Sequence, residues 1–314
     1  MNSIYIITPC FNASATIDQT LYSVFRQHCN LPVHYHVQDG SSSDGTQEKL
    51  EKFSNEVKRA NTGNKLIFSW SSRPDKGMYH AINLAVEHLN IPKESFMGWI
   101  NADDLIYENC FRHLSQVTNA FPHIHWLGGK PLVMDMAGNI LPQGQSPWYG
   151  QQLLQHGLCD GLHGPYLQQE GTFWRKALWD TVGGVNPNFR LAGDWDLWRR
   201  MAQHTSYVQL PWHMGIFRKR PGQLSQNISA YAAEVSNILP RGLRRKALRK
   251  LFPVLDSLTA PSVMLSGAGQ LELNEMPLAP SIKTKIRMLL IGFGLYSFVA
   301  FFQSILRTLK GCKG

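Results

Sequence analysis

Short apolar runs alternate with segments of helical periodicity over the first hundred residues. Each apolar run ends at polar or turn-forming residues, so four buried strands are predicted, at 4–7, 33–37, 66–70 and 96–100. Between them, apolar positions recur with helical spacing, which predicts helices at about 14–28, 46–59 and 77–89. Strands that alternate with helices favour an α/β fold, with a mostly parallel sheet covered on both faces.

The ends of these strands carry the first candidate chemistry. The predicted strands are followed by Thr8, by Asp39 and by the acidic pair Asp103 and Asp104. Ligands of open α/β sheets bind beyond the carboxyl ends of the strands. We therefore expect these side chains to line one crevice.

The pattern is less regular after residue 125. Residues 125–150 mix short apolar runs with Gly and Pro and favour β-structure and loops, and residues 207–218 favour a strand and a loop. A helix is predicted at about 194–201, with Asp194 near its start. No fixed period repeats along the chain.

Charge changes the picture of the last quarter of the chain. Residues 241–314 hold 12 Lys and Arg against 3 Asp and Glu, and so carry the whole net charge of +9. The same stretch contains a run of 19 residues without formal charge, Met288–Leu306, flanked by basic residues on both sides. Basic and apolar character together favour an anionic membrane surface over nucleic acid as the partner. We expect no nucleic-acid binding.

The flanking charges also bear on how this run meets a membrane. A spanning helix usually has its positive excess on one side, whereas this run has it on both, which favours a helix or hairpin in the interface. A buried helix that packs on the preceding domain remains an alternative. The sequence thus predicts a domain at 1–225 and a basic, partly apolar, helical membrane-associating tail at 226–314.

The cysteines indicate the compartment. The five cysteines form no C-x-x-C pair, and the N-terminal residues lack a basic leader, so we expect a reducing compartment and no signal peptide. We expect a cytoplasmic protein that is peripheral or monotopic on the inner face of the cell membrane.

Six short segments, in order, resemble the family 2 glycosyltransferases of bacterial polysaccharide synthesis, which have the GT-A fold. They are TPCFNASATIDQTLYSVFRQ from Thr8, QDGSSSDGT from Gln38, RPDKGMYHAIN from Arg73, WINADD from Trp99, QQEGTFWR from Gln168 and GDWDLWRRM from Gly193. The resemblance covers about residues 3–225. It implies a Rossmann-like, mostly parallel sheet flanked by helices.

The acidic pair suits a divalent cation. The diphosphate of a nucleotide-sugar leaves with extra negative charge, which Mg²⁺ or Mn²⁺ held by one or two carboxylates can neutralise. The resemblance implies that Asp104 is the metal ligand and that Asp103 contacts the ribose or donor sugar. A solvated acidic turn that caps the next helix is the alternative.

The resemblance also implies a set of donor-binding residues. Asp39 would accept hydrogen bonds from the base or ribose, although Asp, Ser and Gly also make such turns for structural reasons alone. Arg218 would clamp phosphate, unless it is a surface arginine in a basic loop. His80 stands where family members often have Asp. The donor-binding residues expected are Thr8, Pro9, Asn12, Asp39, Arg73, Asp75, Lys76, Asp103 and Arg218.

Asp194 is the candidate general base. The acceptor hydroxyl loses a proton as it attacks the anomeric carbon, and a positioned carboxylate can take it. Family members often have an acidic pair here, but Gly193 precedes Asp194, and Asp196 is two residues along the helix and points elsewhere. An N-cap role for Asp194 is compatible with catalysis. Glu170 is a candidate acceptor contact or helper base.

The function expected from these motifs is inverting, metal-dependent transfer of a sugar from a nucleotide-sugar, UDP- or GDP-linked, to a hydroxyl of a glycan or lipid-linked acceptor. Two alternatives stay open. A nucleotidyltransferase of similar fold would be expected to show a Gly-rich basic phosphate loop after the first strand, where this chain has CFNASATI. A non-catalytic membrane scaffold would not need the acidic residues named above.

Overall fold

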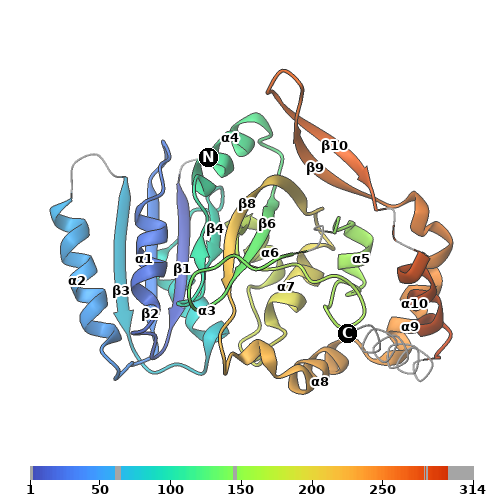
Figure 1. Ribbon diagram of the computed structural model, residues 1–314, viewed down its shortest axis with the longest axis horizontal. Coiled ribbons are helices and arrows are strands. Elements are labelled where there is room, and N and C mark those ends of the chain that lie inside the picture. The colour runs from blue at the N-terminus through green and yellow to red at the C-terminus, as the bar shows by residue number, and fades with distance from the viewer. Residues whose placement is uncertain (1–2, 61–64, 144–146, 279, 281, 296–314) are drawn as a thin grey trace.

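The computed structural model describes residues 3–60, 65–143, 147–278, 280 and 282–295. Within them, ten strands form one mixed sheet in the order β10-β9-β8-β6-β7-β4-β1-β2-β3, with β5 paired to β8 (Figure 1). The strands are β1 (Ile4–Cys10), β2 (Val33–Asp39), β3 (Leu66–Ser72), β4 (Phe96–Trp99), β5 (Leu105–Ile106), β6 (Trp126–Met134), β7 (Thr172–Arg175), β8 (Val208–Arg218), β9 (Thr259–Leu265) and β10 (Leu271–Pro277).

Helices cover both faces of this sheet, as the alternating pattern predicted. The α-helices are α1 (Ile17–Phe25), α2 (Thr46–Arg59), α3 (Met78–Leu89), α4 (Cys110–Ala120), α5 (Gln151–Gln155), α6 (Lys176–Val182), α7 (Gly193–Met201), α8 (Ile228–Ile238), α9 (Arg241–Leu251) and α10 (Ile282–Gly292), and the 3-10 helices are η1 (Leu224–Gln226) and η2 (Phe252–Ser257). The α/β fold class is confirmed, and the elements predicted up to residue 100 lie within a few residues of their expected bounds.

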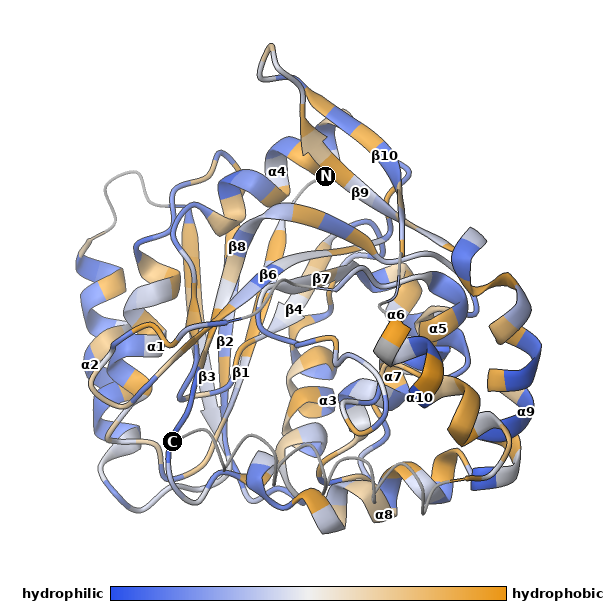
Figure 2. Ribbon diagram, turned by 45° about the vertical axis from the view of Figure 1, so that its right-hand side comes forward, coloured by the Kyte–Doolittle hydropathy of each residue, from blue (hydrophilic) through white to orange (hydrophobic). Residues whose placement is uncertain are grey.

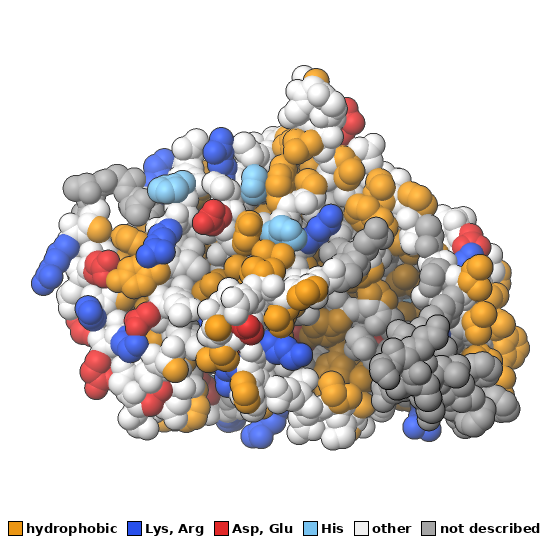
Figure 3. Space-filling view, viewed as in Figure 1, with side chains coloured by type: hydrophobic (Ala, Val, Ile, Leu, Met, Phe, Trp, Pro, Cys, Tyr) orange, Lys and Arg blue, Asp and Glu red, His pale blue; other side chains and the backbone are white. Residues whose placement is uncertain are grey.

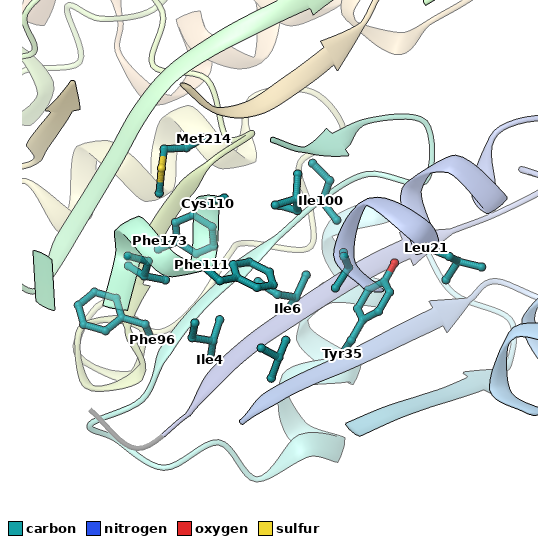
Figure 4. Close-up of a cluster of buried hydrophobic side chains, with 14 of the residues drawn as sticks. Ile4, Ile6, Leu21, Tyr35, Phe96, Ile100, Cys110, Phe111, Phe173 and Met214 are labelled. Carbon is teal, nitrogen blue, oxygen red and sulfur yellow. The ribbon is translucent and has the colours of Figure 1, made fainter. Parts of the chain in front are cut away.

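Strand β1 is buried on both faces because it lies inside the parallel half of the sheet, between β2 and β4. Its alternate residues enter two different cores. Ile4 and Ile6 pack with residues of α1, α2 and α4, and Figure 4 shows them beside Phe96 and Phe111. Tyr5 and Ile7 belong to the core formed with α3, α6 and α7.

Four tryptophans fix α7 behind the strand ends. Trp198 of α7 stacks on Trp99 of β4 and on Trp126 of β6, with ring centroids 5.9 Å and 5.5 Å apart, and meets Trp174 of β7 edge-on at 5.3 Å. Aromatic pairs of this kind contribute about 0.5–1.5 kcal/mol each beyond the area they bury. The first turn of α7, which carries Asp194, is therefore held firmly relative to the sheet.

The second half of the sheet mixes parallel and antiparallel pairs. Strand β7 runs antiparallel to both β4 and β6, whereas β8 runs parallel to β6. Register shifts in the β6–β8 pair fall at Gly128, Lys130 and Pro131. The strand predicted at 207–218 is confirmed as β8, and the helix predicted at 194–201 as α7.

The segment after residue 225 is only partly helical. Helices α8, α9 and α10 lie in it, but so does the hairpin of β9 and β10, which projects at the top of Figure 1 and joins the sheet through β8. The expectation of a helical tail is therefore corrected in part: the segment also contains a hairpin, and a strand pairing between Gln209 and Ser262 ties it to the sheet. The domain boundary near residue 225 stays a prediction.

Apolar and charged side chains are distributed unevenly over the surface. On the left of Figure 3, over α1, α2 and β1–β3, acidic and basic side chains are interspersed, whereas apolar side chains gather at the base of the β9–β10 hairpin. In the part of the chain that is described, no helix has both the length and the apolar character to cross a membrane. Of the run Met288–Leu306, the residues after 295 lie outside that part.

Candidate active site

The carboxyl ends of the parallel strands meet at one edge of the sheet. Gly40 N donates to Cys10 O at 2.8 Å, Arg73 N to Asp39 O at 3.0 Å, and Ile100 N to Ile7 O at 2.9 Å. The ladder of β1, β2, β3 and β4 is thus kept up to the residues where the loops begin. The loops expected to line a crevice therefore begin at the same edge of the sheet.

Asp39 lies at the end of β2, is fully buried and is held by serines. Ser42 Oγ donates to its Oδ1 at 2.5 Å, while Ser42 N and Ser72 Oγ donate to its Oδ2 at 3.0 Å and 2.6 Å. Ser42 Oγ in turn accepts from Asn12 N at 2.7 Å. Asn12 has a φ of 48° in the left-handed region, which Asn tolerates better than most residues. Ser42 therefore links Asp39 to Asn12.

Thr8 and Pro9 line the floor of this region. Thr8 is fully buried, and its Oγ1 is 3.0 Å from the hydroxyl of Tyr35 on the neighbouring strand. Pro9 lies opposite Gln38 in the ladder and precedes the loop. Phe11, which the sequence pattern did not single out, is 64% exposed. It therefore offers an open aromatic surface above the strand ends.

The loop after β3 faces the same region, at the ends of β1 and β2. Its bend is fixed by Asp75 Oδ1, which accepts from Gly77 N at 2.7 Å, and by His80 Nδ1, which accepts from Lys76 N at 3.2 Å. A Cβ added to Gly40 would lie 2.7 Å from Asp75 Oδ2 and 3.3 Å from the Phe11 ring. Asp75 and Phe11 therefore approach each other over Gly40. The side chains of Arg73 and Lys76 in this loop are exposed.

The two acidic residues after β4 have different surroundings. Asp104 is 1% exposed; its Oδ1 accepts from Arg218 N at 2.8 Å and its Oδ2 from Asn101 Nδ2 at 3.0 Å. Asp103 keeps 14% of its side chain exposed, and its Oδ2 accepts from Arg220 Nε at 2.6 Å. Neither residue caps a helix, since the N-cap of α4 is Asn109.

Arg218 and Arg220 both serve the acidic loop. Arg218 is 2% exposed, so it is not a surface arginine; its Nε donates to Asp103 O at 2.8 Å and its Nη2 donates to Gln19 Oε1. Gln223 Nε2 donates to Arg218 O. The buried guanidinium thus holds the 103–104 loop against α1, and the side chain that remains accessible is Arg220, at 42% exposed.

Glu170 lies between the acidic loop and α7. It is 2% exposed, and Gln169 Nε2 donates to its Oε1 at 2.6 Å. Burial raises the pKa of Glu170, and the nearby charge of Asp194 contributes in the same direction. Burial likewise raises the pKa of Asp104, and the charges of Glu170 and then Asp103 raise it further. Glu170 therefore interacts electrostatically with both Asp104 and Asp194, the two carboxyls that the sequence analysis singled out.

Asp194 is buried in the first turn of α7 and is held by two tyrosines. The hydroxyl of Tyr166 donates to its Oδ2 at 2.5 Å, and that of Tyr79 donates to its Oδ1 at 3.3 Å. Trp195 N donates to the same Oδ1 at 2.8 Å. Burial raises the pKa of Asp194, and these hydrogen bonds offset part of the rise. Asp194 is not the N-cap, which is Ala192.

The neighbours of Asp194 differ from those of a paired acidic motif. A Cβ on Gly193 would lie 2.6 Å from the Tyr79 ring, so that ring occupies the space where a second acidic side chain would stand. Asp196 points away and pairs with Arg200 at 2.8 Å and Arg199 at 3.2 Å, as its position in the helix predicted.

Sequence reasoning missed Phe11, which lies in the loop after β1, and three residues that reach the site from other elements: Tyr79, Tyr166 and Arg220. Tyr79 carried no signal, because it lies on the apolar face of a helix. Arg220 is only two residues from Arg218, and only the register of β8 shows that Arg218 is buried and Arg220 accessible. In the described part of the chain, no three His, Cys, Asp or Glu side chains are grouped so that they alone can hold a metal ion.

Residues 5–153 match the family model described as Glycosyl transferase family 2. Relatives from Mycobacterium bovis and Mycobacterium tuberculosis, both named PGL/p-HBAD biosynthesis glycosyltransferase, are 26% identical over 196 residues. That alignment covers 61% of this chain and 66% of the relative, just under two thirds of its length.

Two solved structures show the same fold. S. aureus TarS 1-349 in complex with UDP-GlcNAc has a TM-score of 0.55 at 17% identity, over 82% of this chain and 67% of that one. Mannosyltransferase PcManGT from Pyrobaculum calidifontis, in complex with GDP-Man and Mn²⁺, has a TM-score of 0.50 at 17% identity, over 78% and 64%. The sheet flanked by helices is thus of the GT-A type, and residues 5–153, just under half of the chain, are similar to glycosyltransferase family 2.

Proposed function

We propose that this chain transfers a sugar from a nucleotide-sugar to a hydroxyl group of a glycan or lipid-linked acceptor. One observation carries the proposal: Asp104, Glu170 and Asp194 come from three separate segments beside the parallel strand ends, where burial and the charge of Glu170 raise the pKa of Asp104, and burial and the charge of Asp194 raise the pKa of Glu170. Such convergent, buried carboxyls are typical of a catalytic site. The family match at residues 5–153 supports the same conclusion.

The donor nucleoside is proposed to bind over β1 and β2. Phe11 is exposed enough for a base to stack on it, and Asp39 with its serines ends the adjoining strand. Thr8, Pro9 and Asn12 shape the pocket from below, and Asp75 closes it from the β3 loop. Because TarS and PcManGT were solved with UDP-GlcNAc and GDP-Man, UDP- and GDP-linked sugars are the donors to test first.

The acidic loop fits a hard divalent cation, Mg²⁺ or Mn²⁺. Its donors are oxygens, and Asn101 Oδ1 and Glu170 Oε2 are buried with no hydrogen-bond partner among the described atoms. Asp103 would hold the ion, with Asp104 behind it, because both oxygens of Asp104 already accept hydrogen bonds whereas Asp103 is partly exposed. When bound, such an ion neutralises the diphosphate as a Lewis acid.

Cationic side chains add to the diphosphate site. Arg220 rests on Asp103 and is the accessible guanidinium of the loop, so it is better placed than the buried Arg218 to reach phosphate oxygens. Arg73 and Lys76 are exposed in the facing loop. Arg218 then acts by holding the acidic loop in place, and Arg220 takes the clamping role.

Asp194 is proposed as the general base. Its carboxylate takes the proton from the acceptor hydroxyl while that oxygen attacks the anomeric carbon and the nucleoside diphosphate leaves from the opposite side, which inverts the configuration. The two tyrosines hold the carboxylate still. Its Oδ1 already accepts from Tyr79 and from Trp195 N, whereas Oδ2 accepts from Tyr166 alone and can accept a further hydrogen bond. Glu170 lies beside this path as a candidate acceptor contact.

Membrane attachment is proposed for the C-terminal region. Ile282, Ile286 and Leu289 are exposed at helical spacing along α10, and Phe293 just after it is exposed too, while Met288 and Ile291 pack on α9. In Figure 2 the hydrophobic residues of α10 lie next to hydrophilic residues of α9. Exposed Lys246, Arg249 and Lys250 on α9 add positive charge, which suits a peripheral position on an anionic cytoplasmic membrane surface.

A donor screen tests the proposal. The full-length chain is heated with single UDP- and GDP-sugars, with and without Mn²⁺ or Mg²⁺, and release of the nucleoside diphosphate is followed with a membrane lipid extract as acceptor. We expect at least one nucleotide-sugar to raise the melting temperature, because binding to the folded state stabilises it by RT ln(1 + [L]/Kd). A chain that neither binds nor consumes any nucleotide-sugar would contradict the proposal.

A further inference from the structure

Of the two tyrosine hydroxyls that donate to Asp194, that of Tyr166 makes the shorter hydrogen bond. Tyr166 lies in a loop rather than in a helix. Its position depends on how that loop, residues 158–167, is held. Tyr166 pairs with Asp160 in an isolated antiparallel bridge, and the Tyr149 hydroxyl donates to the carbonyl oxygen of Tyr166 at 2.7 Å. The loop therefore folds back on Asp160.

Asp160 organises this loop from its centre. Its carboxylate is fully buried, and its Oδ1 accepts from the backbone N–H groups of Leu162, His163 and Gly164 at 3.0, 2.8 and 3.3 Å. Burial alone would raise the pKa of Asp160, but hydrogen bonds from His163 and the charge of Arg244 lower it to about 2. The carboxylate is therefore charged throughout the neutral range.

The positive partner of Asp160 comes from the C-terminal region. Arg244 of α9 is 3% exposed, and its Nη1 donates to Asp160 Oδ2 and lies 2.7 Å from His163 Nδ1. Arg287 of α10 donates to Leu162 O. Arg244 is thus withdrawn from the basic surface of α9 and committed to the loop. Removal of one partner from a buried charge pair of this kind strongly destabilises the folded protein, because the other charge stays buried without compensation.

We propose that Arg244 is a positioning residue for sugar transfer: through Asp160 it fixes the loop that aims the Tyr166 hydroxyl at Asp194. The proposal rests on the proposed role of Asp194 as the base. It makes the C-terminal region a working part of the active site in addition to a membrane anchor.

The titratable groups that face Asp194 define the expected effect. They are Tyr79 from α3, Tyr166 from the loop, Tyr231 from α8 and Glu170 beside β7. Tyr166 stabilises the charged form of Asp194, so a displaced Tyr166 raises the pKa of Asp194. A base must be deprotonated to act, so the acid limb of the kcat/KM profile moves to higher pH.

The test compares pH profiles of kcat/KM for a soluble acceptor. Tyr166→Phe should move the acid limb up by roughly one pH unit, the size expected for one hydrogen bond to a charged group. The double variant Arg244→Met/Asp160→Asn, which leaves no unpaired buried charge, should shift it in the same direction. Combined with Tyr166→Phe it should add no further shift, because both act through one hydroxyl.

Controls separate this role from general stability. Lys285→Met removes the ion pair between α10 and Asp256, which does not involve the loop, and should leave the profile unchanged. Donor affinity by calorimetry should be unaltered in every variant. A folded Arg244→Met/Asp160→Asn chain with the wild-type profile, or one whose shift adds fully to that of Tyr166→Phe, overturns the assignment. A wild-type chain that binds donor but transfers no sugar overturns the proposed function itself.

Discussion

At the scale of single residues, burial separates side chains that look equivalent in the sequence. Asp103 and Asp104 are adjacent acids, yet one is partly open and paired to Arg220 and the other is buried under Arg218 N and Asn101. The sequence predicted an acidic pair at this strand end. It could not assign their roles, because exposure depends on the β8 register more than a hundred residues later.

Substitution of each acid should therefore have a different effect. The Asp103→Asn variant should keep the fold. Its affinity for the nucleotide in the presence of Mn²⁺ should fall at least about tenfold, which corresponds to roughly 1.4 kcal/mol of binding free energy. Asp104→Asn should lower the free energy of unfolding by about 1–3 kcal/mol, because it disturbs buried hydrogen bonds. Calorimetric titration and urea unfolding measure the two effects. Unchanged Mn²⁺-dependent binding by folded Asp103→Asn would reject Asp103 as the ligand.

Gly193 gives a second prediction at this scale. A Cβ there would lie 2.6–2.8 Å from three atoms of the Tyr79 ring, so Gly193→Ala must push that ring away from Asp194. We expect a fall in kcat of roughly tenfold or more with donor affinity retained, since misplacing a catalytic group lowers the rate of transfer. Gly242→Ala, a helical glycine with open space around it, is the matched control. Equal kcat in the two variants would contradict this role of Tyr79.

At the scale of elements, local periodicity predicted the first half of the fold and only parts of the second, among them α7 and β8. Residues 46–59 and 66–70 carry their own pattern, because each βα unit packs on its neighbour in sequence. Strands β7, β9 and β10 carry no such pattern. Strand β7 is only four residues long and pairs with β4 and β6, which are distant in sequence, while β9 pairs locally with β10 and reaches the sheet through the distant β8. The hairpin in the predicted helical tail is the clearest instance.

Helix α8 illustrates how one element supports another without touching substrate. Glu234 accepts from the backbone N–H groups of Arg190, Leu191 and Ala192 at 3.0, 3.0 and 2.9 Å, just before α7 begins. Glu234→Ala leaves these donors without their acceptor and should lower the free energy of unfolding by about 1–3 kcal/mol. Glu272→Ala, at an exposed strand position, should change it little. Urea unfolding compares them, and equal stabilities would refute the capping role.

The exposed face of α10 makes the membrane proposal testable with the full chain. Ile286→Asp places a charge at a position that is 52% exposed, so the fold should tolerate it, but insertion into a lipid interface becomes unfavourable. We expect co-sedimentation with anionic vesicles to fall, while Leu273→Asp on β10 leaves it unchanged. Equal pelleting of all three proteins would remove α10 from the membrane contact.

At the scale of the whole molecule, the surroundings of Asp194 depend on contacts between segments far apart in the chain. Asp194 is predictable from a local motif, but the groups that tune it come from α3 and from the 158–167 loop, which Arg244 of α9 fixes. Sequence spacing does not reveal such contacts, because each partner sits in a segment with an adequate structural explanation of its own. The C-terminal region thus contacts the loop that carries Tyr166, which is the basis of its proposed role in transfer.

The most direct test of the central claim is sugar transfer by Asp194→Asn, measured beside donor binding in the same preparation. We expect the variant to bind the nucleotide-sugar with wild-type affinity and to lose transfer by roughly 10²–10⁴-fold, the range for general base catalysis. Transfer by the folded variant at the wild-type rate would show that Asp194 is not the base, and loss of donor binding would show that it belongs to the donor site instead.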